Sequence, residues 1–259
     1  MYRFLATPRW IAFHLLCAAA VAGMIVAGFW QLSRLDERGV FKDTVRARTA
    51  APVVPLDDLR QNGDAALTGL EWRRIEATGT YIADPQFTVV NVSQDGSAGQ
   101  DPVNGLLLDD GTVLIVNRGF TSSGGEVPPP PEGTVTVTGR IRLTQTAGYG
   151  QASDDGTQRL SQIRRVDLVA LSQQFEQPVL PVYVDQTDMS LETSGRLVPV
   201  AFPNLDGGPP HLSYALQWFT FSVCVAVGWV LAVRKSVRTR KGIAPRRRHL
   251  EIDDSYAAG

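Results

Sequence analysis

The chain has 259 residues, of which 44% are hydrophobic and 20% charged, and its net charge is −1. These averages are ordinary for a globular protein, but residues 10–33 and 212–233 contain no Asp, Glu, Lys or Arg. Each of these stretches can cross about 30 Å of hydrocarbon as a helix, which excludes a wholly soluble protein. The intervening residues 34–210 hold 15 basic and 23 acidic residues, so nucleic-acid binding, which needs a basic footprint, is excluded too.

Residues 1–9 and the first apolar stretch predict a short cytoplasmic N-terminus followed by a transmembrane helix over residues 10–33. Trp10 and Trp30 bracket this helix like interfacial anchors. A cleaved signal peptide is the alternative, with Ala20-Val21-Ala22 as its cleavage site. The apolar run continues to Leu32, well past the length of a signal-peptide core, and this favours a retained anchor.

Residues 34–210 predict one mainly antiparallel β domain, large enough to bury its own core. Runs rich in β-branched and aromatic residues recur through it. The predicted strands are 72–82, 86–93, 105–108, 112–117, 134–143, 180–185 and 197–202. Asp109-Asp110-Gly111-Thr112 indicates a hairpin turn, and 167–175 a helix capped by Asp167. Residues 93–102, 122–133 and 146–156 are rich in Gly, Pro and polar residues and predict loops.

The chain's cysteines, Cys17 and Cys224, and its histidines, His14, His211 and His249, all lie outside residues 34–210. This excludes disulfides, structural zinc and histidine-dependent hydrolysis in the β domain. The sequence also contains no phosphate-binding loop, nucleophile elbow or zinc-protease helix. We therefore expect a protein that is not an enzyme.

The second apolar stretch predicts a transmembrane helix over residues 211–233, followed by a basic cytoplasmic tail, 234–259. Eight Lys and Arg lie between Arg234 and Arg248, which places the C-terminus in the cytoplasm. Two spans then place the N-terminus there as well. The predicted fold class is a membrane protein in which two transmembrane α-helices flank one mainly antiparallel β (α+β) extracytoplasmic domain. Its expected location is the bacterial-type plasma (inner) membrane, with the lipid bilayer as a partner.

His211 lies at the outer entrance of the second span, after Gly207-Gly208-Pro209-Pro210. Helical spacing projects Tyr214, Ala215 and Trp218 to the same face as His211. Such a stripe suits a flat apolar ligand such as haem, with Nε2 of His211 as axial ligand and the small Ala215 leaving space beside it. The simpler alternative is an interfacial cap, or packing against the first helix. His14 is more than about 20 Å away in depth, so one iron cannot reach both histidines.

Four patches of the sequence resemble the Surfeit-locus cytochrome oxidase assembly factors, the Shy proteins of yeast. They occur in family order from the first span to the last. The patches are Gly28-Phe29-Trp30-Gln31-Leu32-Ser33-Arg34-Leu35; Trp72-Arg73-Arg74 with Gly79 and Tyr81; Val113-Leu114-Ile115-Val116-Asn117-Arg118-Gly119-Phe120; and His211-Leu212-Ser213-Tyr214-Ala215-Leu216-Gln217-Trp218-Phe219. Pro209-Pro210 stands where the family usually has an Asn pair, and Phe120 where it has Trp.

This resemblance implies a non-enzymatic factor that assembles a haem-copper (cytochrome c) oxidase. It implies binding of haem a through His211, with Tyr214 and Trp218 shaping the pocket, and delivery to the large oxidase subunit. The implied partners are that subunit and haem a synthase. The alternative is a membrane-tethered scaffold that stabilises an oxidase subunit without binding haem.

Several of the other matched residues allow two interpretations. Trp30, Gln31 and Arg34 are candidates for partner contact, but Trp30 and Arg34 also suit an interface anchor and a snorkelling cation. Asn117 and Arg118 are candidates for partner contact too. Arg118 has the chemistry to pair with a haem propionate or a partner carboxylate, or with an acid of its own domain in a structural turn.

Overall fold

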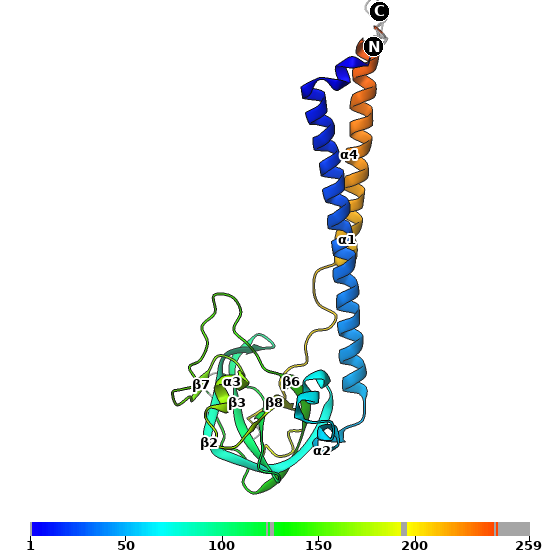
Figure 1. Cartoon of the computed structure of the whole chain (residues 1–259). Helices are drawn as coiled ribbons and strands as arrows, with labels where there is room; N and C mark the ends of the chain where they lie inside the picture. The colour runs from blue at the N-terminus through cyan, green and yellow to red at the C-terminus, as the bar shows by residue number, and fades with distance from the viewer. Residues whose placement is uncertain (1, 123, 125–126, 193–195, 241, 243–259) are drawn as a thin grey trace, which may run out of the picture. The chain divides into compact units, whose positions relative to one another are not determined.

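The computed structural model describes residues 2–122, 124, 127–192, 196–240 and 242 (Figure 1). The basic tail beyond residue 242 lies outside the described residues. The chain divides into a helical unit, Met1–Val40 with Asp206–Gly259, and a β unit, Phe41–Leu205. The β unit is therefore slightly shorter at both ends than the 34–210 domain predicted from sequence.

The helical unit is built on two long antiparallel helices that lie side by side, α1 (Pro8–Ala50), which belongs to this unit up to Val40, and α4 (His211–Arg240) (Figure 1). A short helix, η1 (Arg3–Ala6), precedes them. Pro8 suits the first position of α1, and Pro52 follows its end, where it disfavours further helix. Both helices are long and apolar enough to cross a membrane, and only 6% of the apolar window of each is buried. The two predicted spans are thus helical, and each helix continues past its predicted C-terminal end.

Six buried or half-buried positions of α1 recur at alternating spacings of three and four residues, the pattern of closely packed, nearly antiparallel helices. They are His14, Cys17, Val21, Met24, Gly28 and Gln31. On α4 the buried residues are Ala215 and Ser222. Gly28 is needed at the seam between the helices, because a Cβ added there would lie 2.5 Å from Cε1 of Phe219. Small residues therefore set how closely α1 and α4 approach, as in other membrane helix pairs.

The β unit is an eight-stranded sheet with the order β1-β2-β6-β8-β4-β3-β5, and β7 pairs with β2. An additional pairing between β2 and β3 closes β2, β6, β8, β4 and β3 into a ring. Most pairs are antiparallel; β1–β2, β2–β7 and β4–β8 are parallel. The strands are β1 (Val54–Pro55), β2 (Arg74–Gln94), β3 (Ser97–Leu108), β4 (Val113–Asn117), β5 (Thr121–Ser122), β6 (Thr134–Leu143), β7 (Gln162–Ile163) and β8 (Val179–Gln186).

The core of the β unit has two clusters. One is formed by apolar side chains of the ring strands together with α2 (Leu56–Arg60) and η2 (Asp64–Leu70), and includes Ile75, Leu106 and Val184. The other packs residues of β2, β3, β4 and β8 against β7 and α3 (Leu168–Ser172), and includes Phe87 and Ile115. Closure of the ring buries both faces of β4, whose five residues are all buried.

Several local predictions for the β unit are confirmed. Asp110 accepts from the backbone N–H of Thr112 at 2.9 Å in the turn between β3 and β4, where Gly111 has φ of +82°. Asp167 caps α3 by accepting from the N–H of Val169 at 3.0 Å. Two other predictions are wrong. The expected loop at 93–102 is largely strand, the start of β3, and the expected strand at 197–202 makes only an isolated bridge between Phe120 and Val198.

Candidate functional site

His211 is the first residue of α4 and is partly buried in the helical unit. Its Nδ1 lies 2.8 Å from Oε1 of Gln31 on α1. A carboxamide oxygen only accepts hydrogen bonds, so Nδ1 is the donor and carries the ring proton. Its Nε2 makes no hydrogen bond within the described part of the chain and is accessible. In the neutral ring Nε2 is therefore the nitrogen without a proton, and such a nitrogen is the one that binds a metal.

The predicted stripe on α4 is only partly as expected. Ala215 is fully buried at the seam, so the prediction that it leaves space beside His211 is wrong. Tyr214 and Trp218 are 44% and 37% exposed. Trp218 packs edge to face on Phe221, with ring centroids 6.3 Å apart. His211 thus contacts the first helix, while the two aromatic residues after it remain accessible.

Helical rotation of about 100° per residue decides on which side of the seam each predicted residue lies. Relative to Gln31, which faces α4, both Trp30 and Arg34 lie on one side of the seam. Because α4 runs antiparallel to α1, Tyr214 and Trp218 turn to that same side from His211. We call this set, Trp30, Arg34, Tyr214 and Trp218, the aromatic side of the seam.

The opposite side of the seam has a different character. Phe29 of α1 and Phe219 of α4 pack there edge to face at 5.5 Å, as the same rotation requires. On the aromatic side Trp30 is 53% exposed, and the guanidinium of Arg34 lies 5.6 Å from its ring centroid. Arg34 also pairs with Glu37 at 2.7 Å, an exposed ion pair of small energetic weight. A cation and exposed aromatic rings therefore lie on the aromatic side of the seam.

The loop that leads into α4 is held close to α1. Gly208 has φ of +121°, and a side chain there would collide with the guanidinium of Arg38. The carbonyls of Pro209 and Pro210 accept from the N–H groups of His211 and Tyr214. The two prolines therefore end the loop and start the helix at His211. Arg38, which lies two turns beyond Gln31 on α1, could not be identified from the sequence.

The other described histidine, His14, lies at the far end of the helical unit. Its Nδ1 accepts from the indole Nε1 of Trp229 at 2.8 Å. Trp229 is 18 residues after His211, which is about 27 Å along α4. The predicted separation of the two histidines is thus present in the packing of α1 and α4, and no single iron can bind both.

Asn117 and Arg118 are both buried in the β unit and bonded within it, which favours the structural interpretation over contact with a partner. Arg118 is fully buried and pairs with Glu192 at 2.8 Å. All five of its N–H donors are used, since the others reach Asn104 and the carbonyls of Pro128 and Pro129. Asn117 is buried and donates to Asp101 at 3.1 Å. The alternative of pairing within the domain is the one observed.

The second matched patch is also structural. Trp72 is 5% exposed, and Cζ of Arg142 lies 3.8 Å from its ring centroid. Arg142 in turn lies 3.6 Å from the buried carboxylate of Asp185. This arrangement stacks a cation between an aromatic face and an acid and fixes the start of β2 on β6 and β8.

Asp101 on β3 is a buried carboxyl with an unusual environment. Burial raises its pKa to about 6, and the nearby negative charge of Asp185 adds to this, against the hydrogen bond from Asn117. Its Oδ1 has no hydrogen-bond partner. The group therefore titrates near neutral pH inside the β unit.

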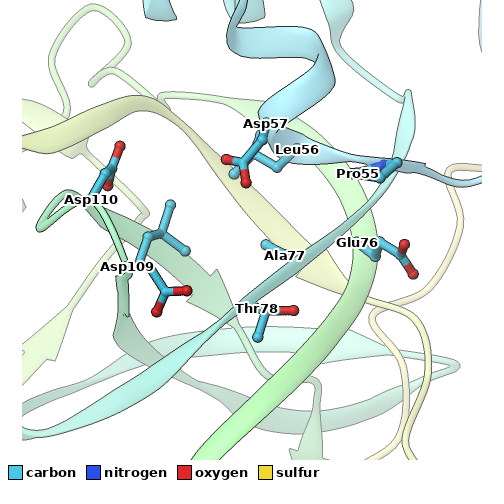
Figure 2. Close-up of a pocket in the computed structure, with 9 residues that line it drawn as sticks. Pro55, Leu56, Asp57, Glu76, Ala77, Thr78, Asp109 and Asp110 are labelled. Carbon is cyan, nitrogen blue, oxygen red and sulfur yellow. The ribbon is translucent and has the colours of Figure 1, made fainter.

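An open pocket of about 300 Å³ lies in the β unit beside β2, between β1 and the end of β3. Figure 2 shows Asp109 and Asp110 on one side of it and Glu76 on another, with Asp57 at the start of α2. Arg60 pairs with Asp110 at 2.7 Å. The sequence predicts a turn at Asp109 and Asp110 and a strand at Glu76, and does not bring these acids together. Among the described residues, no group of three or more His, Cys, Asp or Glu is arranged to hold a metal ion.

Comparison with known proteins identifies the chain's relatives. The model of the SURF1 family matches residues 18–223, which include most of α1, the β unit and the first half of α4. An uncharacterised SURF1-like protein of Mycobacterium bovis is 29% identical over 247 residues, covering 92% of this chain and 88% of the relative. A SURF1-like protein of Monosiga brevicollis is 26% identical, covering 80% and 82%, and one of Rickettsia felis is 23% identical, covering 83% and 93%.

The match confirms the resemblance to the Surfeit-locus factors. Membership implies a general role in oxidase assembly, in a family of assembly factors rather than enzymes. Together with the two apolar helices it identifies a membrane protein. The chain belongs to the SURF1 family.

Proposed function

We propose that this protein binds haem a through Nε2 of His211 and aids its insertion into the large subunit of cytochrome c oxidase. The observation that carries the proposal is the hydrogen bond of Nδ1 to Gln31, which leaves Nε2 unprotonated and accessible. Histidines that bind metals usually donate their other ring N–H to an oxygen in this way. Haem here is cargo, and the carrier needs to supply only one ligand atom to its iron.

The surroundings of His211 suit a flat ligand with an apolar body and acidic edges. Trp30, Tyr214 and Trp218 offer exposed rings on the aromatic side of the seam, and Arg34 offers a cation for a propionate. One axial ligand from an accessible site favours reversible binding, because a carrier must release what it holds. Residues that would hold the ligand therefore come from both α1 and α4.

Measuring the haem that co-purifies with the full chain tests this proposal. His211→Ala should lose the bound haem while inserting into the membrane normally. His14→Ala is the matched control, because His14 also lies in the helical unit but its Nδ1 accepts a hydrogen bond from Trp229. Equal haem content in the wild type and in His211→Ala would refute the assignment.

The proposed topology places the β unit outside the cytoplasm of a bacterial-type inner membrane, with both termini inside. Arg234, Lys235, Arg238 and Arg240 at the end of α4 support this orientation. Tyr149 is fully exposed in the β unit. A Tyr149→Cys variant made in a background without Cys17 and Cys224 should react with a membrane-impermeant maleimide in intact cells. Labelling only after lysis would show that the β unit faces the cytoplasm and would contradict the proposed topology.

A second candidate is a scaffold that stabilises an oxidase subunit through its β unit and helices without touching haem. The exposed Trp30 and Phe29 on α1 favour it, since large exposed aromatic residues suit contact with another membrane helix. On this account His211→Ala assembles oxidase normally, whereas Trp30→Ala does not. The two candidates thus predict opposite phenotypes for His211.

A further inference from the structure

The two described histidines of the helical unit are hydrogen-bonded in opposite senses. Nδ1 of His211 faces an acceptor, the Oε1 of Gln31, so the proton is on Nδ1. Nδ1 of His14 faces a donor, the indole N–H of Trp229, so the proton of the neutral ring is on Nε2. Of these two histidines, His211 alone is therefore held with Nε2 unprotonated in the neutral ring.

We propose that Gln31 is a positioning residue that fixes the tautomer and the ring orientation of His211. This inference rests on the proposed role of His211 as a haem ligand. An imidazole whose Nδ1–H is bound to a fixed acceptor directs the lone pair of Nε2 in one direction and is a stronger ligand. Gln31 touches no haem in this arrangement and acts only through His211.

The bond to Gln31 depends on the close approach of α1 and α4. Gly28 lies one turn before Gln31, and its missing side chain makes room for the ring of Phe219, two turns after His211. Ala215, one turn after His211, is fully buried at the same seam. The contact at Gly28 therefore keeps the two helix backbones close enough for the side chain of Gln31 to reach the imidazole of His211.

A merely structural role is the competing explanation, in which the Gln31–His211 bond ties the helices together and nothing more. The two roles differ in their readout. A structural tie predicts changes in stability alone, whereas a positioning residue changes the tautomer of His211 and the electronic properties of any iron bound to it. The tautomer can be measured without haem.

The tautomer experiment uses the full chain in lipid nanodiscs with ¹⁵N-labelled histidine. The sequence has only three histidines, so His14→Phe and His249→Gln suffice to assign the ring signals. We expect His211 in the Nδ1–H form and His14 in the Nε2–H form. Gln31→Leu should abolish the Nδ1–H preference of His211, and Gln31→Glu should keep it. Trp229→Phe is the matched control and should change only the signals of His14.

The ligand experiment adds hemin, ferric protoporphyrin, to the same samples. Gln31→Leu should weaken hemin binding about 10- to 100-fold, the usual cost of losing such a partner. Gln31→Glu should bind hemin and lower its reduction potential, because a carboxylate makes the imidazole more basic. Trp229→Phe should bind hemin like the wild type.

The outcomes separate this inference from the proposed function. If Gln31→Leu keeps His211 in the Nδ1–H form, or binds hemin with unchanged affinity and spectrum while His211→Ala does not, the positioning role is wrong and the ligand role stands. If His211→Ala binds hemin as tightly as the wild type, the ligand role fails, and the inference fails with it. A tautomer change in Gln31→Leu with loss of hemin binding supports both.

Discussion

Arg118 and Glu192 form an ion pair at 2.8 Å, and neither side chain is more than 3% exposed. The two residues are 74 positions apart, and the pair joins the end of β4 to the segment after β8. Arg118 also donates to the carbonyls of Pro128 and Pro129, so it fastens the proline-rich segment as well. The matched Asn117-Arg118 patch therefore holds the β unit together.

Arg118→Met should destabilise the β unit by about 3–5 kcal/mol, because it leaves the carboxylate of Glu192 buried without a partner. Hydrogen exchange of the β4 and β8 amides in the full chain measures this change. Arg159→Met is the control, since Arg159 pairs with Asp84 at the surface, and it should cost no more than about 1 kcal/mol. Replacing Glu192 as well as Arg118 by Met should recover part of the loss; a single variant as stable as wild type would contradict the account.

The stability of the β unit should fall as pH rises from about 4 to about 6. The folded state keeps a proton on Asp101 up to its pKa of about 6, whereas the unfolded chain loses that proton near 3.8. The folded state thus binds more protons in this window, and the loss is about 3 kcal/mol from this group. Asp101→Asn should remove this part of the pH dependence and be more stable than wild type at pH 7. Urea unfolding in detergent across this range measures it, and identical profiles would show that Asp101 does not titrate there.

Gly28→Leu should separate α1 from α4 and break the Gln31–His211 bond, because the added side chain meets the ring of Phe219. We expect hemin binding to fall at least tenfold with unchanged membrane insertion. Gly23→Leu is the control, since a Cβ at Gly23 has no neighbour within 4 Å. Hemin titration of both variants measures this difference. Equal affinities of Gly28→Leu and Gly23→Leu for hemin would mean that the close approach of α1 and α4 is not needed for binding.

Trp218→Leu should weaken hemin binding by about 1–2 kcal/mol, roughly 5- to 30-fold, by removing a flat ring from the aromatic side of the seam. Leu216 is 59% exposed and lies almost opposite Trp218 on α4. Leu216→Ala should therefore leave the affinity unchanged. A larger effect of Leu216→Ala than of Trp218→Leu would place the ligand on the other side.

Much of the fold was predictable from local sequence signals. The absence of charge over residues 10–33 and 212–233 predicted both helices, and the turn at Gly111 and the cap at Asp167 were identified by residue type. The start of β3 was missed because its Gly, Ser and Asp residues are typical of loops. That segment is a strand because it pairs with the end of β2 and with β5, which are contacts the composition does not encode.

The candidate site was only half predictable. His211 was identified from its place before an apolar helix and from the family resemblance. The bond to Gln31 joins residues 180 positions apart and depends on how two helices are rotated against each other. For the same reason Arg118 was open to several readings, because its partner Glu192 has no signal in the sequence. Long-range pairing, rather than residue type, decided both assignments.

The proposed role of His211 is to carry haem into oxidase assembly. The most direct measurement is the reduced-minus-oxidised visible spectrum of membranes from a strain that lacks this gene and is complemented with the wild type, His211→Ala or His14→Ala. The account predicts the a-type haem band with wild type and His14→Ala, and its selective loss with His211→Ala. A full a-type band and normal oxidase activity with His211→Ala, made at wild-type levels, would contradict it.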